Sequence, residues 1–564
     1  MKNLIKIVNL FGRKLKIKIL IGILIILFSA ILEAFSLATI FPYVDFLINQ
    51  KISVSEKVAV YLKFIIDFEK INYLNFTFFI FLIFLFKNFI ITISVYLLNR
   101  IVYGFQKLLG IELLKIYTKK PLIFFSKINS STIVRNLTID LTNFTNGISS
   151  FINLVTEVFF IFLIFTILVF INFKVTIILL SFFIFFSFIF YSFTKKKLKA
   201  LGIQRSECDE KRIKTINQTI NGIYDIKLNF SINYFIERFA VQLGSYTKIV
   251  GFFNFLLNTP KIWIEMITLS SFILSIIFFL KLQNSNFLDF IPLIGLYAVS
   301  AFKIMPSFSR ILVHYQNIHY SSGVFQNFYD IFIYNKNKKK KIKKLNLSLN
   351  HLTLRNINFA FKDKNKIIKN FSYKFKIGNI YGVSGESGAG KSTLLKIIMG
   401  IYENYTGKIK LNNKLDIKRN IIGWQGKISF VPQKPFYFDE TIYENICFGT
   451  KVSSENILKV KKLIKYLNLD NKIKNLKLGI ETKMGEGGSI FSGGELQRIA
   501  LARALFKEPE LLILDESFNA LDLKNKKKVF EYLDIIKKNK IIIIVTHEAD
   551  ILKRCSKKLK LKKN

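Results

Sequence analysis

The chain has 564 residues, enough for several domains, and it combines a net charge of +46 with 51% hydrophobic residues. Such a charge is typical of nucleic-acid-binding proteins, but long runs of Phe, Ile and Leu argue against a soluble protein of that class and favour a membrane protein. The three cysteines, Cys208, Cys447 and Cys555, are far apart and lack metal-binding spacing, so we expect reduced cytoplasmic thiols.

Six apolar segments in the first half of the chain are long enough to span a membrane as helices, which takes about 20 residues each. They cover residues 19–40, 76–98, 151–171, 175–191, 262–280 and 287–305. The first is too long for the apolar part of a signal peptide and lacks a small-residue cleavage site, so we expect it to be retained. The loops at 99–150 and 192–261 carry patterns of helices that continue into the cytoplasm.

Lysine and arginine are concentrated before the first span, between the second and third, and after the fourth. The connections after spans three and five are nearly uncharged. By the positive-inside rule, this pattern predicts a multi-pass protein of the cytoplasmic membrane with both termini in the cytoplasm. Residues 54–67, between the first two spans, are interpreted either as an external amphipathic helix lying on the bilayer or as an ordinary loop helix.

Several charged residues fall inside the predicted spans, where each costs a few kcal/mol. They are Lys87, Lys261 and Lys303, with Glu33, Glu157 and Glu265. Two interpretations stay open: snorkelling or intramembrane ion pairs of Lys with Glu, or a cavity lined by lysines that binds an anionic headgroup.

The domains are predicted as residues 1–330, a transmembrane domain with six helices and cytoplasmic extensions, and 351–564, a soluble α/β domain. Residues 331–350 between them are predicted to be a linker, because 335–350 is rich in lysine and polar. We expect a solvated tether, with attraction to anionic membrane lipid as a modest addition.

Residues 385–392 fit G-x-x-x-x-G-K-[ST], the P-loop pattern, after an apolar strand-like segment and before a helical one. Glycines in such a loop let backbone N–H groups surround phosphate oxygens, and the helix N-terminus favours negative charge. The residues expected to hold the phosphates are Gly385, Glu386, Ser387, Gly388, Ala389, Gly390, Lys391, Ser392 and Thr393. Lys391 would hold the β- and γ-phosphates and Ser392 would bind Mg²⁺. The alternative is a glycine-rich turn without a ligand.

Four further segments carry polar residues after apolar strands or at a helix start. Asp515 ends the apolar run 511–514 and would hold Mg²⁺ through water, and Glu516 beside it would orient or deprotonate the attacking water. Ser492, with Gly493 and Gly494, begins a helical segment and predicts a second phosphate-binding turn. Gln433 and His547 each follow a strand-like run.

The order of these motifs resembles the nucleotide-binding domain of ABC transporters, with ATP and Mg²⁺ as cofactors and ATP hydrolysis as the activity. The resemblance implies that Phe361 stacks on adenine and that Gln433 contacts the γ-phosphate and Mg²⁺. It implies Glu516 as the catalytic carboxylate and His547 as a γ-phosphate contact. The signature residues Ser492, Gly493, Gly494 and Glu495 would close on ATP held by another subunit.

Three departures from the family pattern stand out. Phe361 replaces the usual Tyr, which keeps the ring face for stacking. Phe491 and Glu495 replace the usual Leu and Gln of the signature, and we expect the Glu495 carboxylate to repel phosphate and slow turnover. Asn519 replaces the common Ser of the D-loop, residues 519–522.

One membrane domain and one ATPase domain in a chain resemble an exporter-type half-transporter, which implies a homodimer unless a sister chain exists. The membrane half is similar to the bacterial flippase for lipid-linked oligosaccharides at Glu33, Lys87, Lys261 and Lys303. This similarity predicts membrane lipid and a lipid-linked glycan as partners, and no nucleic acid beyond ATP. The alternatives are an exporter of peptides or hydrophobic drugs, an ATPase acting on nucleic acid, and a membrane sensor with an inactive ATPase.

Overall fold

The computed structural model describes residues 13–39, 73–125, 127–171, 173–282, 291–336, 348–360, 367–450 and 452–562. The predicted surface segment 54–67, residues 337–347 of the predicted linker, and Phe361 lie outside these ranges. The chain divides into two compact units, residues 1–120 with 124–339 and residues 121–123 with 340–564.

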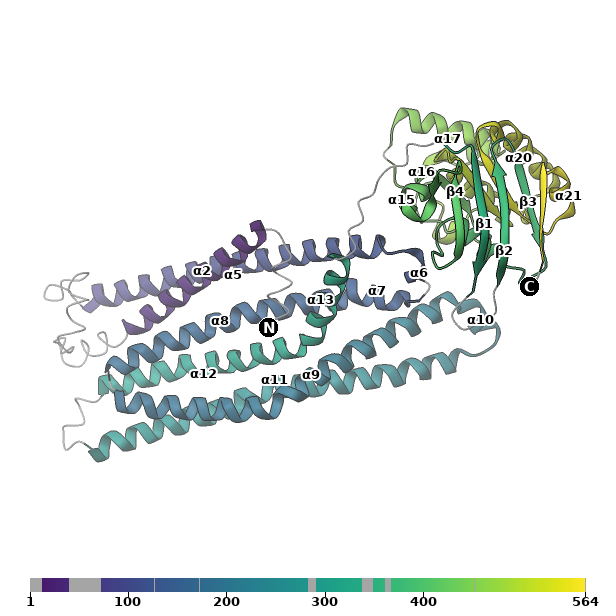
Figure 1. Cartoon of the computed structure of the whole chain (residues 1–564). Coiled ribbons are helices and arrows are strands. Elements are labelled where there is room, and N and C mark those ends of the chain that lie inside the picture. The colour runs from purple at the N-terminus through teal and green to yellow at the C-terminus, as the bar shows by residue number, and fades with distance from the viewer. Residues whose placement is uncertain are drawn as a thin grey trace. The chain divides into compact units, whose positions relative to one another are not determined.

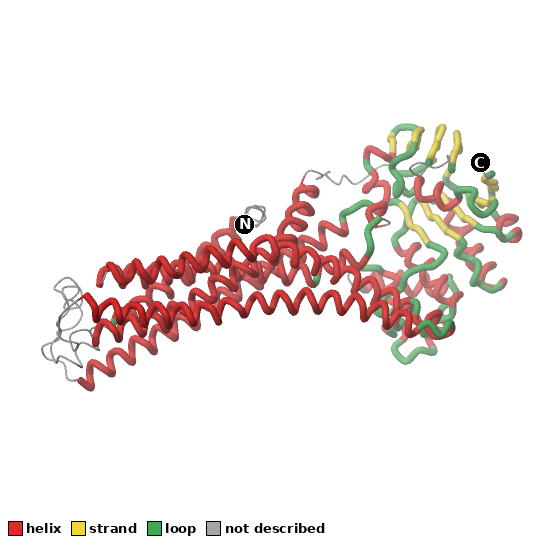
Figure 2. The backbone as a smooth tube through the Cα atoms, turned by 90° about the horizontal axis from the view of Figure 1, so that it is seen from below, coloured by secondary structure: helices red, strands yellow, loops and turns green. Residues whose placement is uncertain are grey.

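The first unit is helical (Figures 1 and 2). The helices of this part of the chain are α2 (Arg13–Ala38), α5 (Tyr73–Thr118), α6 (Leu122–Phe125), α7 (Ser130–Leu137), α8 (Ile139–Ile171), α9 (Phe173–Asn221), α10 (Ile223–Leu228), α11 (Ile232–Leu282), α12 (Ile291–Tyr320) and α13 (Ser322–Lys336). Among the described residues, three helical stretches are long and apolar enough to cross a membrane: Ile19–Ser36, Thr77–Thr118 and Ser130–Phe170. The predicted spans 175–191 and 262–280 fall in α9 and α11, and the described part of the span 287–305, from residue 291, falls in α12; all three stay predictions.

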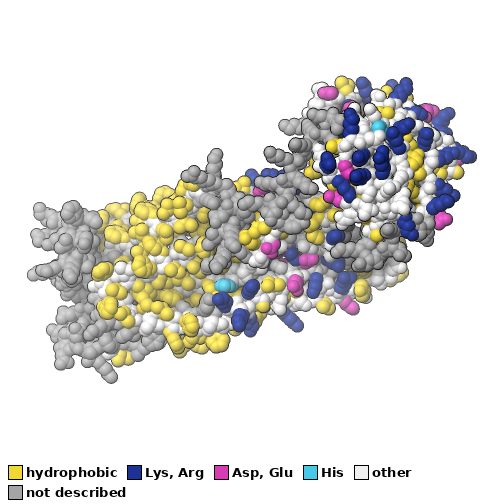
Figure 3. Space-filling view, in the orientation of Figure 1, with side chains coloured by type: hydrophobic (Ala, Val, Ile, Leu, Met, Phe, Trp, Pro, Cys, Tyr) yellow, Lys and Arg dark blue, Asp and Glu magenta, His cyan; other side chains and the backbone are white. Residues whose placement is uncertain are grey.

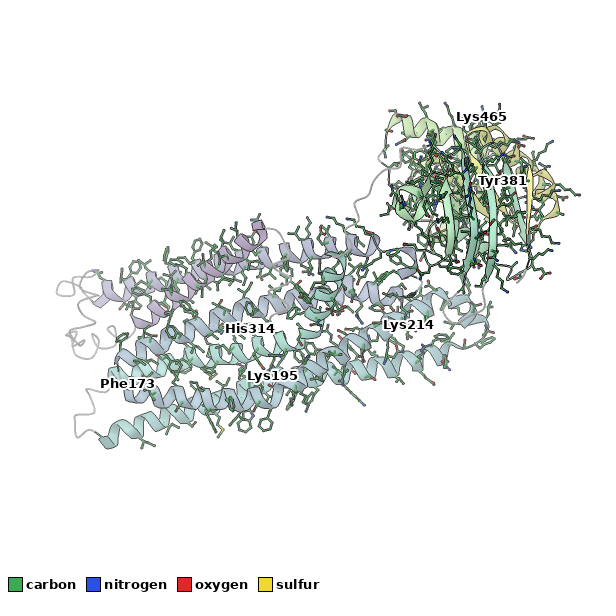
Figure 4. All side chains as sticks on the ribbon, viewed as in Figure 1. Phe173, Lys195, Lys214, His314, Tyr381 and Lys465 are labelled. Carbon is green, nitrogen blue, oxygen red and sulfur yellow. The ribbon has the colours of Figure 1, made fainter. Side chains whose placement is uncertain are left out.

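The long helices extend well beyond the segments predicted to span the membrane. α5 has 46 residues, which makes it about 69 Å long, more than twice the thickness of the hydrocarbon core. On the visible face of this unit, hydrophobic side chains gather over one end and charged side chains over the other (Figure 3). Along α9, the exposed Phe173 lies at one end, and Lys195 and then Lys214 follow toward the other (Figure 4).

A buried polar network joins α7, α8 and α9. Arg135 is its centre: Nε donates to Asp140 at 3.0 Å, Nη1 donates to the Ser206 carbonyl at 3.2 Å and to Glu210, and Nη2 donates to Asn136. The Asp140 side chain is only 1% exposed. Such a network is stable only while every charge keeps its partners, so it fixes these helices relative to one another.

The second unit holds two sheets (Figures 1 and 2). One is antiparallel, in the order β2-β1-β4-β5, with β1 (His351–Phe359), β2 (Ile368–Lys376), β4 (Thr406–Leu411) and β5 (Leu415–Asp416). The other is parallel, in the order β6-β7-β8-β3-β9, with β3 (Ile380–Gly385), β6 (Ile428–Val431), β7 (Leu511–Asp515), β8 (Ile541–Val545) and β9 (Lys557–Leu561). The α-helices are α14 (Lys391–Ile398), α15 (Ile421–Gln425), α16 (Ile442–Cys447), α17 (Ser454–Tyr466), α18 (Asp470–Lys474), α19 (Gly493–Phe506), α20 (Leu523–Ile536) and α21 (Ala549–Arg554).

The parallel sheet is buried on both faces, which explains the unbroken apolar sequence of its central strands. Along β8, Ile541 and Ile543 pack into one hydrophobic core, and Ile542 and Ile544 pack into the other. Leu511 and its neighbours on β7 alternate in the same way. The predicted combination of a helical membrane domain and a P-loop α/β domain is therefore the observed fold.

Candidate nucleotide and membrane sites

The parallel sheet brings the P-loop and Asp515 to the same edge. Val545 of β8 is aligned with Val383 of β3 on one side and with Asp515 of β7 on the other. The P-loop continues directly from Gly385, the last residue of β3. In an open parallel sheet, ligands bind at the carboxyl ends of the strands, and both motifs lie there.

The P-loop has the backbone geometry that its glycines predict. Gly388 and Gly390 have φ of 83° and 86°, in the left-handed region, and Gly390 is the N-cap of α14. Gly385 has φ of 153°, and a Cβ there would lie 2.5 Å from the carbonyl oxygen of Leu561. A side chain at these positions would therefore strain or displace the loop.

Lys391, the first residue of α14, is nearly buried and folds back across the loop. Its Nζ donates to the carbonyl oxygens of Gly385 at 2.7 Å and Glu386 at 3.0 Å. The ammonium group thus lies over the loop interior, where a phosphate would meet it. Ser392 and Thr393 follow in the first turn of the helix, and Ser392 is exposed.

Asp515 and Glu516 place two carboxyl groups side by side at this edge. Burial and the neighbouring Glu516 raise the pKa of Asp515, and Lys396 and Lys391 oppose the shift. Two adjacent carboxylates in a half-buried site fit a hard divalent cation, which prefers oxygen ligands and removes the repulsion between them.

Glu516 is the residue on which the other predicted side chains converge. Its carboxylate accepts hydrogen bonds from Gln433 at 2.7 Å and Asn519 at 3.4 Å, and His547 Nε2 lies 3.5 Å from Oε1. Its φ of 48° is unusual for a residue with a side chain, and such strain concentrates at functional sites. The structure thus brings Gln433, Glu516 and His547 together, although they are far apart in the sequence.

Ser492 caps the N-terminus of α19 in a reciprocal arrangement with Glu495. The Ser492 N–H donates to the Glu495 carboxylate at 2.8 Å, and the Glu495 N–H donates to the Ser492 hydroxyl at 3.4 Å. Glu495 therefore completes a capping box, a role that the sequence analysis overlooked. Gly493 and Gly494 follow, and a Cβ on Gly494 would lie 2.6 Å from the carbonyl oxygen of Ala520 in the D-loop.

Within one chain, the signature and the P-loop belong to different parts of the domain. Phe491 packs into the core on one face of the parallel sheet, and Leu394 and Leu395 of α14 pack into the core on the other. For residues 385–393 and 491–495, all of which the structure describes, no hydrogen bond joins the two segments.

In the helical unit, Lys87, Lys303 and Glu33 come together from α5, α12 and α2. Lys303 Nζ lies 3.2 Å from Glu33 Oε1. Lys87 is only 4% exposed, with Nζ 4.5 Å above the Phe84 ring, and the charges of Lys303 and Glu33 both act on it. Lys261 is exposed on α11, and in the described part of the chain no ion pair or hydrogen bond joins it to the other two lysines.

Arg310 on α12 is a charged residue of this unit that the sequence analysis missed. Its guanidinium pairs with both oxygens of Glu157, the second at 3.2 Å, and donates to Ser307 at 2.9 Å. Lys303, Ser307, Arg310 and His314 follow one another at steps of four, three and four residues, which places them on one face of the helix. That spacing was readable from the sequence, but the predicted span ended at residue 305.

Comparisons with known proteins agree with this architecture. The family described as ABC transporter transmembrane region matches residues 19–307, and the family described as ABC transporter matches residues 368–519. A putative export ATP-binding/permease protein of Rickettsia bellii (strain RML369-C) is 38% identical over 198 residues, which are 35% of this chain and 34% of that protein. The multidrug resistance-like ATP-binding protein MdlA of Buchnera aphidicola subsp. Baizongia pistaciae (strain Bp) is 38% identical over 216 residues, 38% of this chain and 37% of that protein.

These alignments span about a third of the length of the curated relatives. A solved structure, that of a bacterial Atm1-family ABC exporter with ATP bound, covers 97% of this chain and 94% of its own, with a TM-score of 0.79 at 17% identity. At that identity the likeness establishes the fold.

Proposed function

This chain belongs to the ABC transporters, since the transmembrane region of that family matches about half of it, and we propose that it is an exporter-type half-transporter of the cytoplasmic membrane. In this proposal it hydrolyses ATP to move an anionic amphiphile, a lipid-linked oligosaccharide with a polyprenyl-pyrophosphate anchor. The observation that carries the choice of cargo is the cluster of Lys87, Lys303 and Glu33 among the membrane helices.

ATP hydrolysis is assigned to the edge of the parallel sheet. The P-loop N–H groups and Lys391 would bind the phosphates, and Ser392, Asp515 and Gln433 would hold Mg²⁺, which would supply neutralisation of the charge that develops on the phosphates. Glu516 accepts a proton from, or orients, the attacking water, and its bond from Gln433 fixes the carboxylate in place. His547 Nε2 lies 3.5 Å from Glu516 Oε1, which places the imidazole beside the attacking water, where it would contact the γ-phosphate.

The working unit is proposed to be a homodimer. The signature at Ser492 packs away from the P-loop of its own chain, so its N–H groups reach a γ-phosphate only on a second copy. Two ATP molecules would then hold two ATPase domains together, and hydrolysis would release them. Rigid helices longer than the bilayer is thick would carry that motion to the membrane-spanning segments.

The cargo assignment follows from charge. Lys303 pairs with Glu33, and Lys87 has no carboxylate of the described residues within ion-pair distance, which leaves an excess positive charge in helices that otherwise fit an apolar environment. A buried cation without its own counter-ion costs several kcal/mol, so a site of this kind persists where an anion binds. Lysine suits a pyrophosphate as a point charge, and the exposed Lys261 would be a third contact.

The test is a flipping assay in proteoliposomes with a fluorescent polyprenyl-pyrophosphate oligosaccharide. Lys87→Gln with Lys303→Gln removes both clustered cations, and we expect flipping to fall at least tenfold, which corresponds to about 1.4 kcal/mol of lost binding. Lys115→Gln is the matched control, because Lys115 lies on the same helix as Lys87 but is exposed and pairs with Glu112 one turn away.

Flipping by the double variant at the wild-type rate would refute the proposed cargo. ATPase stimulation by hydrophobic drugs that is unaffected by both substitutions would instead support the alternative of a drug exporter. That alternative has the name of the Buchnera relative in its favour.

A further inference from the structure

Glu33 is the carboxylate in the lysine cluster, and its attachment is weak compared with that of Glu157. Among the described residues, the Lys303 ammonium is the single donor to the Glu33 carboxylate, at 3.2 Å. Glu157, in contrast, is held by two nitrogens of the Arg310 guanidinium, which Ser307 also positions. Bidentate pairs of this kind are stronger and more rigid than a pair made by one ammonium group.

The three charged side chains of the lysine cluster also differ in exposure. Lys303 and Glu33 are 37% and 25% exposed, so the pair is open on one side. Lys87 is 4% exposed, and no carboxylate of the described residues lies within ion-pair distance of it. Of the two cations that an entering anion would meet, Lys87 is thus buried and without a carboxylate partner among the described residues, and Lys303 is already paired with Glu33.

We infer that Glu33 is a resident counter-ion, which pairs with Lys303 when cargo is absent and is displaced by the cargo's anionic group. The return of Glu33 to Lys303 then releases the cargo. With Glu33 in place the cluster has a net charge of +1, and with Glu33 displaced the two lysines offer +2. A dianionic headgroup matches the second state, so its binding requires the displacement. This inference rests on the proposed function, because it presumes that the lysine cluster binds the cargo.

The consequence is a trade between affinity and turnover. Glu33 competes with the cargo and weakens its binding, but the same competition speeds release after the membrane helices have rearranged. Removing the carboxylate should therefore lower the concentration at which cargo saturates the transporter and also lower the maximal rate. A residue with a purely structural role would not raise the apparent affinity for cargo and lower the maximal rate together when it is replaced.

The experiment measures ATPase stimulation in phosphatidylcholine nanodiscs by geranylgeranyl diphosphate, geranylgeranyl monophosphate and uncharged geranylgeraniol. In Glu33→Gln we expect the half-saturating concentration of the diphosphate to fall about fivefold, the factor that corresponds to about 1 kcal/mol for a partly exposed ion pair. The maximal rate should fall as well. The shift should be smaller for the monophosphate, and geranylgeraniol should have no effect on any variant.

Glu265→Gln is the control, since Glu265 is an exposed carboxylate in a predicted span and has no ion pair within the described residues. Glu33→Asp keeps the charge on a shorter side chain and should give an intermediate shift, which protects the test against misfolding of the first variant. Adding Lys303→Gln to Glu33→Gln should abolish the gain in affinity.

A half-saturating concentration for Glu33→Gln within twofold of the wild type, or above it, would overturn the role of Glu33 while leaving the cargo proposal standing. A wild-type protein that no prenyl diphosphate stimulates would overturn the proposed cargo, and the inference with it.

Discussion

Replacing Arg135 with methionine tests whether the polar network between α7, α8 and α9 holds the helical unit together. Methionine keeps much of the volume of the side chain but removes every hydrogen bond that the guanidinium makes. Asp140 would then keep one hydrogen bond, from the Ser206 hydroxyl at 3.4 Å, although its side chain is almost fully buried.

The size of the effect follows from the burial of these charges. Removing one partner of a buried ion pair costs about 3–5 kcal/mol, because the other charge stays in a low-dielectric site. The lower end applies here, since Arg205 also favours the Asp140 charge and since Glu210 is 30% exposed and keeps a hydrogen bond from Thr132. At about 2 °C of melting temperature for each kcal/mol in a large domain, the loss amounts to about 6 °C.

The assay is thermal unfolding of the purified protein in detergent, followed by the fluorescence of its two tryptophans or by loss of soluble protein. The compensating variant Arg135→Met with Asp140→Leu removes both charges, and it should recover most of the stability because no buried carboxylate is left without a partner. A melting temperature of Arg135→Met within about 1 °C of the wild type would refute this reasoning. A double variant that is less stable than either single variant would do the same.

Three further outcomes are expected in the ATPase domain. Glu516→Gln should lower ATP hydrolysis at least about 100-fold with ATP binding retained, as measured by phosphate release and nucleotide binding, whereas Glu548→Gln, whose partner is Lys526, should keep near-normal hydrolysis. Asp515→Asn should stabilise the nucleotide-free protein at neutral pH. Burial raises the pKa of Asp515 above its usual 3.8, because the folded protein disfavours the ionised carboxylate. Below pH 3.8 the carboxyl is protonated in the folded and the unfolded chain, and as the pH rises through the folded-state pKa its ionisation destabilises the fold. The gain in melting temperature should therefore vanish in acid, and a gain that persists at low pH would contradict the cause. Gly494→Ala should cost about 1–3 kcal/mol of stability, because its Cβ would overlap the Ala520 carbonyl oxygen, and Gly493→Ala should cost less because its Cβ meets only ordinary contacts. Equal melting temperatures for the two alanine variants would show that the signature and the D-loop do not pack as described.

Much of the proposed nucleotide site could be predicted from the sequence because each motif is local and ends a strand or begins a helix. The pattern at 385–392 contains its own loop and helix start, and Asp515 ends an apolar strand. The sequence did not show which strands are neighbours, so the convergence of Gln433 and His547 on Glu516 had to come from the sheet order.

Glu495 shows a different kind of limit. The spacing of Ser492 and Glu495 is itself a capping-box pattern, in which a carboxylate three residues after the cap reaches back to the backbone. The expectation from the family pattern was only that this carboxylate repels phosphate. The structure shows the carboxylate engaged by the Ser492 N–H, so its position is set by the helix end of its own chain.

In the helical unit, hydropathy predicted the first three spans, which lie in helical stretches long and apolar enough to cross a membrane, because side chains must match the hydrocarbon. The packing of one helix on another depends on shape along several turns, and no short pattern encodes it. Of the two interpretations offered for the intramembrane charges, ion pairing is observed for Glu33 with Lys303, and Glu157 pairs with Arg310. Pairing does not exclude the cavity interpretation, because Lys87 remains without a carboxylate of its own among the described residues.

The cluster of charged side chains around Arg135 and the cluster around Glu33 differ in charge balance, and this difference indicates different roles. The network around Arg135 contains three arginines and three carboxylates, namely Arg135, Arg205, Arg212, Asp140, Asp209 and Glu210. Its charges cancel, so it is complete without a ligand and acts as a rigid connection between helices. The cluster of Lys87, Lys303 and Glu33 does not balance, because the buried Lys87 has the Phe84 ring beside it but no carboxylate of the described residues within ion-pair distance. An unbalanced cluster is therefore the place where an outside anion completes the charge, and the cargo proposal depends on that imbalance.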